Sequence, residues 1–260
     1  MTYPSPPERA EPARSAATPA GPAPPQYSPD RRWYWDGEQW RLVTAQGPTW
    51  RWSYAPPDAR ATAAVTTVGL ATVGLALFLV GEGLALIAPG SVADTAASIV
   101  QALAFLASLA GFIGAAIAVP MWMHRCYRNL PALGATALGW SPAWAVGAWF
   151  IPIANLVLPY MVARELWAKA SGSPVRSSSL LGLWWAACIT AVVINLIGNF
   201  HGNLQAGNVE TRIALGTGGS ALFNSLAALA SVVAGVLLIT IIRRITRRQR
   251  DRYAELLRGA

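Results

Sequence analysis

From residue 63 onward, the chain alternates between long apolar runs and short polar connections. Crossing the roughly 30 Å of hydrocarbon in a bilayer takes about 20 helical residues. Four runs reach that length: Ala63–Ala88, Ala96–Met121, Ser179–Phe200 and Gly218–Ile242. The pattern predicts an all-α polytopic membrane protein with four transmembrane helices.

A fifth apolar run, Pro142–Ala163, is interrupted by its own prolines. Pro152 removes a helical hydrogen bond in the middle of the run, and Pro159 interrupts it again. The run either crosses the bilayer or dips in and returns to the same side as a re-entrant or interfacial helical hairpin. In the second case the non-helical backbone at Pro152–Asn155 must be buried in protein or lie at the interface.

The arginines discriminate between these two arrangements, because cytoplasmic loops carry an excess of basic residues. If the fifth run returns, nearly all the basic residues that flank the spans share one side: Arg51, Arg60, Arg125, Arg128, Arg164, Lys169, Arg176, Arg243, Arg244, Arg247, Arg248, Arg250, Arg252 and Arg258. Only Arg212 then lies opposite. If the run crosses, either the C-terminal arginines or the N-terminal tail must lie outside. We therefore predict re-entry, with both termini cytoplasmic and the protein in the inner (plasma) membrane.

Composition agrees with a membrane protein, since 54% of the residues are hydrophobic and 12% are charged. The formal net charge is +8. Because the arginines cluster beside apolar segments, we expect anionic lipid headgroups at the basic cytoplasmic face as partners.

The sequence divides into five regions. Residues 1–26 are rich in proline and alanine and are predicted to be disordered. Residues 27–55 form a tryptophan-rich module, and 56–62 are a linker. The membrane domain covers 63–250, with spans 63–88, 96–121, 179–200 and 218–242 and the re-entrant segment 142–163. The last residues, 243–260, form a basic C-terminal helix or tail.

The tryptophan-rich module has the signals of a small β-hairpin. Asp36 and Gly37 favour a type I′ turn between two short strands, which places Trp33 or Trp35 near Trp40. Its basic residues are nearly balanced by acidic ones, so no electrostatic footprint for nucleic acid is present. The module is either a plain structural sheet or a surface for a protein partner.

Within the membrane domain lies an ordered motif from Met121 to Trp167. Its residues are Trp122, Arg125, Asn129, Ser141, Pro142, Trp144, Ala145, Val146, Trp149, Phe150, Ile151, Pro152, Asn155, Pro159, Tyr160, Glu165, Leu166 and Trp167. The motif resembles the bacterial membrane family called domain of unknown function 4328. In addition, the short segment SPDRRWYWDGEQW resembles tryptophan-rich elements in the tails of bacterial membrane proteins. The family resemblance implies a polytopic membrane protein and no particular chemistry.

Several polar residues lie inside the predicted spans, where they are costly and therefore candidates for function. With the predicted topology they converge on the outer leaflet: Glu82, Gln101, Asn195, Asn199, Ser220 and Asn224. One interpretation is that they hold helices together by hydrogen bonds. The other is an outward-facing site for a small ligand or a cation.

No catalytic or cofactor motif stands out. His124 and His201 end different spans on opposite faces, so they cannot share a metal ion. We expect no cofactor, no metal and no catalytic residues, although an interfacial enzyme stays open. The leading hypothesis is a non-enzymatic membrane protein that anchors, senses or assembles with partners. The alternative is a small transporter or channel component that uses the outer polar cluster.

Overall fold

The computed structural model describes residues 28–29, 33–35, 40–42, 54–87, 92–171, 178–205 and 221–258. The chain divides into two compact units, Met1–Arg51 and Trp52–Ala260. The predicted disorder of the tail, 1–26, concerns residues outside the described ranges.

The described part of the first unit contains two short strands, β1 (Trp33–Trp35) and β2 (Trp40–Leu42). They pair in antiparallel fashion, with Trp35 opposite Trp40. In this register four residues connect the strands, more than a two-residue turn has. The predicted turn at Asp36 and Gly37 lies outside the described residues.

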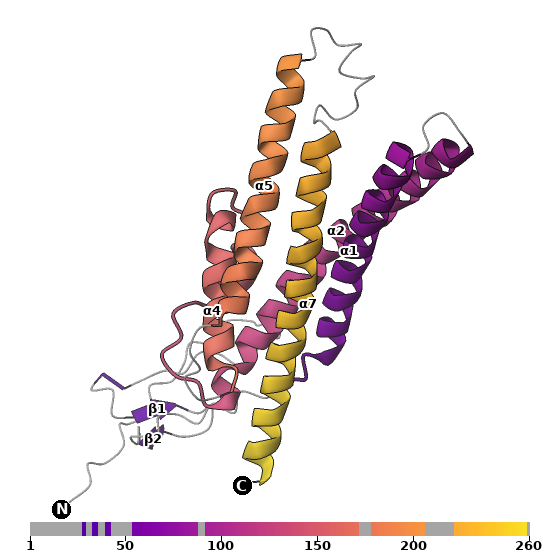
Figure 1. Cartoon of the computed structure of the whole chain (residues 1–260). Helices are drawn as coiled ribbons and strands as arrows, with labels where there is room; N and C mark the ends of the chain where they lie inside the picture. Colours follow the sequence, from indigo (N-terminus) through magenta and orange to yellow (C-terminus); the bar gives the residue numbers. More distant parts are fainter. Residues whose placement is uncertain are drawn as a thin grey trace, which may run out of the picture. The chain divides into compact units, whose positions relative to one another are not determined.

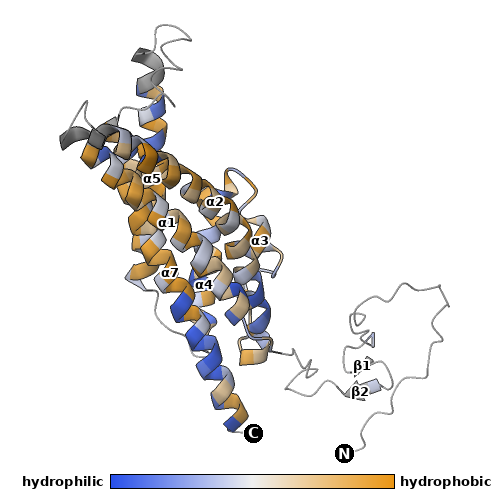
Figure 2. Cartoon of the chain, turned by 90° about the vertical axis from the view of Figure 1, so that its right-hand side faces the viewer, coloured by the Kyte–Doolittle hydropathy of each residue, from blue (hydrophilic) through white to orange (hydrophobic). Residues whose placement is uncertain are grey.

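Four long helices dominate the second unit: α1 (Asp58–Ile87), α2 (Val92–Asn129), α5 (Ser179–Gln205) and α7 (Ala221–Arg258). All four are long and apolar enough to cross a membrane, which confirms the number of spans predicted from the hydrophobic runs. Figure 1 shows these helices, and Figure 2 shows that apolar residues cover much of their length, whereas the second half of α7 is largely polar.

The segment between α2 and α5 is made of short pieces: η1 (Pro131–Leu133), α3 (Trp144–Gly147), η2 (Ala154–Leu156) and α4 (Leu158–Lys169). Gly134 ends η1 with a φ of 88°, a conformation that costs glycine little. The helical structure breaks between α3 and η2, around Pro152. Pro159 lies in the first turn of α4, where a missing backbone N–H is tolerated.

The long helices pack in the order α2, α1, α7, α5. Small residues allow the close approach, as at Gly111 of α2, where an added methyl group would clash with the backbone of Ala71 on α1. Gly235 of α7 lies against Thr72 of α1 in the same way. In the part of the chain that the structure describes, α2 and α5 share no extended interface. The four helices therefore form an arrangement that is open on one side.

The largest buried side chains gather at one end of this arrangement, which we call the base. It contains the start of α1, the end of α2, α4, the start of α5 and the middle of α7. Trp122 of α2, Leu166 of α4, Trp184 of α5 and Ile242 of α7 are all nearly inaccessible. Because the end of α2 and the start of α5 both lie at the base, the segment between them begins and ends there.

Candidate functional site

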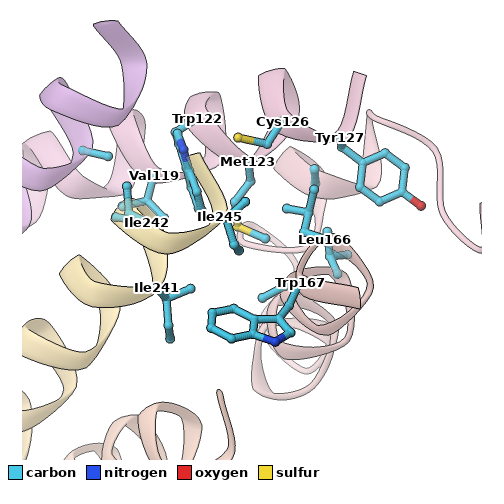
Figure 3. Close-up of a cluster of buried hydrophobic side chains, with 14 of the residues drawn as sticks. Val119, Trp122, Met123, Cys126, Tyr127, Leu166, Trp167, Ile241, Ile242 and Ile245 are labelled. Atoms are coloured by element: carbon cyan, nitrogen blue, oxygen red, sulfur yellow. The ribbon is translucent and has the colours of Figure 1, made fainter. Parts of the chain in front are cut away.

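The base is built around an apolar centre in which motif residues from α2 and α4 meet isoleucines of α7 (Figure 3). Trp122, at 1% exposure, donates a hydrogen bond from Nε1 to Oγ1 of Thr246 over 3.1 Å. Both groups are buried, so each satisfies the polar atom of the other. The bond fixes the position of α7 along α2.

A buried pair of amides continues this connection. Asn129 donates through Nδ2 to the Ala55 carbonyl over 2.9 Å and to Oε1 of Gln249 over 3.3 Å. The Ala55 N–H donates back to Oδ1 of Asn129. Gln249, which is fully buried, donates through Nε2 to the Cys126 carbonyl over 2.8 Å. The segment before α1, the end of α2 and the end of α7 are thus joined by one hydrogen-bonded network.

Glu165 is the centre of a second network, on α4. Its carboxylate accepts hydrogen bonds of 2.7 Å from the Tyr127 hydroxyl and from the Gly139 N–H, and it pairs with Lys169 at 2.8 Å. The Tyr127 oxygen in turn accepts from the Trp140 N–H. Burial raises the pKa of Glu165, but the hydrogen bonds from Gly139, Lys169 and Tyr127 outweigh it, so the pKa lies below its usual value.

Stacked and charged contacts complete the base. Arg248 lies over the ring of Trp167, with its guanidinium carbon 4.0 Å from the ring centre, a cation–π contact. The rings of Tyr54 and Tyr253 stack at 4.1 Å. The pKa of Tyr54 is raised to about 12, mainly by burial of its hydroxyl and to a smaller extent by the negative charge of Asp58. These contacts attach the second half of α7 to α4 and to the start of the unit.

The second half of α7 has one buried face and one basic face. The buried residues recur every three or four positions, as expected for a helix with one packed face: Ile241, Ile242, Ile245, Thr246 and Gln249. The exposed residues between and directly after them are arginines: Arg243, Arg244, Arg247 and Arg250. The α7 helix therefore leaves the apolar bundle as a rigid, positively charged extension.

A smaller group of arginines lies on the α1–α2 side. Arg60 donates through Nη1 to the Met121 carbonyl over 3.2 Å. This places its charge close enough to Arg125 for electrostatic repulsion, to which Arg128 also contributes. Within the described ranges, Arg125 has no acidic partner and no hydrogen-bond acceptor. The group carries positive charge that is available for an anion.

Above the base, the four long helices surround a cavity of about 420 Å³. Each helix contributes to its lining, and so do Trp149, Phe150 and Asn155 from the broken segment. This segment bridges α2 and α5, because α3 packs against α2 and the Leu156 carbonyl accepts a hydrogen bond from Nε1 of Trp185 on α5. The lining is apolar apart from a few uncharged polar side chains.

The outer polar residues predicted from the sequence are placed in different ways. Gln101 donates through Nε2 to Oε1 of Glu82 over 2.7 Å, so these two side chains meet between α1 and α2. Asn195 is exposed and donates to the Ala191 carbonyl of its own helix. Asn199 is exposed and Asn224 is half-buried. Ser220 lies outside the described residues.

No hydrogen bond joins Asn195 or Asn199 to Asn224 in the described structure. Contact between these asparagines therefore stays a prediction. The described residues also contain no group of three His, Cys, Asp or Glu side chains placed to hold a metal ion.

For most of the side-chain contacts in the base, the sequence motif contains one of the two contacting residues. The motif residues Trp122, Asn129, Glu165 and Trp167 all form them. Trp144 packs edge-on against Trp140, and Pro159 is buried in α4. The partners Thr246, Gln249 and Tyr127 were missed. The available signal was the spacing of uncharged residues among the arginines of 243–250, which marks a packed helix face.

A family model described as a domain of unknown function, DUF4328, matches residues 87–247. The chain belongs to this family. The matched region of the DUF4328 protein contains the motif, the broken segment and most of the residues of the base. No curated protein and no solved structure matches the chain.

Proposed function

We propose that this DUF4328 protein is a non-enzymatic inner-membrane protein that anchors its N-terminal tryptophan module at the cytoplasmic face. In this proposal both termini are cytoplasmic, and the broken segment 142–163 enters the membrane from the base and returns to it. The module of residues 27–55 is a β-hairpin that is available to a protein partner.

The observation that carries the proposal is that the motif residues make contacts within the base. Trp122, Asn129 and Glu165 bind to other parts of the base rather than pointing into an open site. Each of them has a partner more than 30 residues away in the chain: Thr246, Gln249 and Tyr127, respectively. The motif therefore supports a rigid platform, the role that an anchoring or assembly protein needs.

The basic face of α7 supports the placement of this platform at the headgroups. Arg243, Arg244 and Arg247 directly follow the apolar part of the helix and are exposed. A basic residue near an anionic membrane surface contributes about 1 kcal/mol of binding. Arg125, which has no acidic partner among the described residues and lies near Arg60, supports placement of the α1–α2 side of the base at the headgroups as well.

The test compares two arginines on the same helix in the full-length protein. Native mass spectrometry measures retention of phosphatidylglycerol relative to phosphatidylcholine. Arg244→Gln is expected to reduce the preference for phosphatidylglycerol about fivefold. Arg258→Gln is the matched control, because Arg258 lies about 21 Å further along the helix, beyond the screening distance of about 8 Å. Equal losses in both variants, or no loss in Arg244→Gln, would contradict placement of the arginine face at the headgroups.

The transporter alternative has one specific observation, the contact between Glu82 and Gln101 inside the membrane domain. The residues that line the cavity do not include either of them. The anchoring proposal therefore has the broader support.

A further inference from the structure

Both α2 and α5 line the cavity above the base, although these two helices share no extended interface in the described structure. Three of its lining side chains are also on the outer surface of the protein. Phe112 of α2 is 51% exposed, Phe150 of the broken segment 67%, and Val192 of α5 46%. A molecule dissolved in the membrane therefore has a lateral entrance, with α1 and α7 as the back wall.

The lining selects for an uncharged, apolar occupant. Its side chains are mostly aliphatic or aromatic, and none of the lining residues is Lys, Arg, His, Asp or Glu. A charged group buried there would have no partner, which is energetically costly. The volume of about 420 Å³ is at the small end of the range for ligand sites, about 300–1,000 Å³. It suits one hydrocarbon chain.

Asn155 provides a polar contact at the bridge between α2 and α5. Its backbone N–H donates to the Ile151 carbonyl, whereas its carboxamide makes no hydrogen bond with the described residues. The neighbouring Leu156 carbonyl is bonded to Trp185, six residues into α5 and hence about 9 Å along that helix. The carboxamide is therefore held near one end of the span, where lipid ester groups lie when the base is at the headgroups.

We propose that this cavity holds one acyl chain of a glycerophospholipid, which enters between α2 and α5 and accepts a hydrogen bond from Asn155 at its ester carbonyl. A free fatty acid fits less well, because its carboxylate would find no cationic side chain in the lining. The proposal rests on four helices crossing the membrane, and its ester contact rests also on the proposed placement of the base at the headgroups. It is independent of the anchoring role and of which headgroup the basic face prefers.

The first experiment tests the position of the chain. The full-length protein in nanodiscs is exposed to phosphatidylcholine with a diazirine in one acyl chain, and crosslinked peptides are identified after irradiation. Labelling of the cavity-lining peptides should be competed by unlabelled phosphatidylcholine. Val192→Trp should reduce it at least about fivefold, as expected when a well-placed contact worth roughly 1 kcal/mol is lost. Val193→Trp is the matched control, because Val193 is 45% exposed but does not line the cavity.

Equal labelling of the cavity and of the outer helix faces, with no effect of Val192→Trp, would overturn the proposal, because it would show ordinary contact with surrounding lipid. Equal losses in both valine variants would overturn it as well. Circular dichroism and gel filtration of each variant confirm that the helices are retained, so that a loss of labelling reports on the cavity.

The second experiment tests the ester contact. Native mass spectrometry compares retention of ester-linked phosphatidylcholine with that of its ether-linked analogue, which lacks the carbonyl oxygen. Wild-type protein should retain the ester lipid about fivefold better, the effect of one hydrogen bond. Asn155→Leu should abolish this difference. Persistence of the difference in that variant, or recovery of a free fatty acid instead of phospholipid as the retained molecule, would overturn the assignment.

Discussion

At the scale of single residues, the base depends on polar groups that are buried and paired. Gln249 is fully buried between arginines on either side, yet its amide contacts both Asn129 and the Cys126 carbonyl. A buried amide without such partners would cost several kcal/mol, about 2–7 in transfer experiments. The pairing therefore specifies one arrangement of α2 and α7, because a shift along the helix would leave these groups unsatisfied.

Glu165 should make the base sensitive to acid. Its pKa in the folded protein lies below the ordinary value, so ionised Glu165 stabilises the fold fully above the unfolded pKa, and this contribution is lost as the pH falls through the folded pKa. Thermal unfolding in detergent should therefore show the wild-type midpoint falling as the pH decreases below about 4.5. Glu165→Gln should lower the free energy of unfolding at neutral pH by about 1–2 kcal/mol and weaken the acid dependence.

The control for this prediction is Glu255→Gln. Like Glu165, Glu255 pairs with a basic residue, here Arg252, but the Glu255 side chain is 57% exposed, and surface ion pairs contribute little. That variant should unfold with the wild-type pH dependence. If Glu165→Gln keeps the wild-type acid dependence, the carboxylate does not stabilise the base in the way described.

The motif made part of this site predictable at the residue scale. Asn129, Glu165 and Trp167 were singled out from the sequence because they belong to the ordered motif. Their partners Gln249 and Tyr127 were not, and Arg248 was counted only among the basic residues of the cytoplasmic side. A contact between distant segments depends on how the helices pack, and a single sequence does not contain that information. Asn155 was predicted as part of a break in the helix, and its place beside the cavity came from the structure.

At the scale of helices, length and hydropathy were enough to find all four long elements. The structure extends all four beyond the predicted spans, and the longest extensions are at the ends of α2, which reaches Asn129, and of α7, which reaches Arg258. These extensions are amphipathic rather than uniformly apolar, so hydropathy alone does not detect them. The broken segment behaves differently, since α3 has only four residues and much of 142–157 is turns. Prolines predict such a break but not the path that the chain then takes.

The packing of α1 on α2 should be sensitive to one methyl group. An added methyl at Gly111 would clash with the Ala71 backbone, which cannot move without moving α1. Gly111→Ala should therefore lower the free energy of unfolding by about 1–3 kcal/mol, the range for overpacking. Gly69→Ala is the matched control, because an added methyl there has no neighbour within 4 Å. It should be neutral or stabilise by up to about 1 kcal/mol through its higher helix propensity.

Thermal unfolding in the same detergent, followed by circular dichroism at a helix-sensitive wavelength, measures both glycine variants. The difference between them is the informative quantity, since each variant makes the same chemical change in a helix of the same bundle. Equal midpoints for Gly111→Ala and Gly69→Ala would show that α1 and α2 are not packed as closely as described.

At the scale of the whole molecule, the order of packing decides what the protein can hold. A bundle with every neighbouring pair in contact would have no lateral entrance, whereas the order α2, α1, α7, α5 leaves one side open above the base. Neither the order nor the opening follows from the sequence, because all four spans have similar apolar surfaces. The open side is also where the broken segment lies, so the irregular backbone has neighbours on both sides.

The proposed topology is argued from the same arrangement and from the arginines. The end of α2 and the start of α5 both lie at the base, so the segment between them should begin and end on one side of the membrane. The base contains Arg60, Arg125 and the arginines after Ile242, which basic-residue statistics place in the cytoplasm. Fusions of a reporter pair, alkaline phosphatase and green fluorescent protein, should therefore read outside after Gly90 and Gly207 and inside after Gly172 and at Ala260. A fusion after Gly172 that reads outside would mean that residues 142–163 cross the bilayer. The residues of the base would then not all lie on one side of the membrane, and the proposed topology would be wrong.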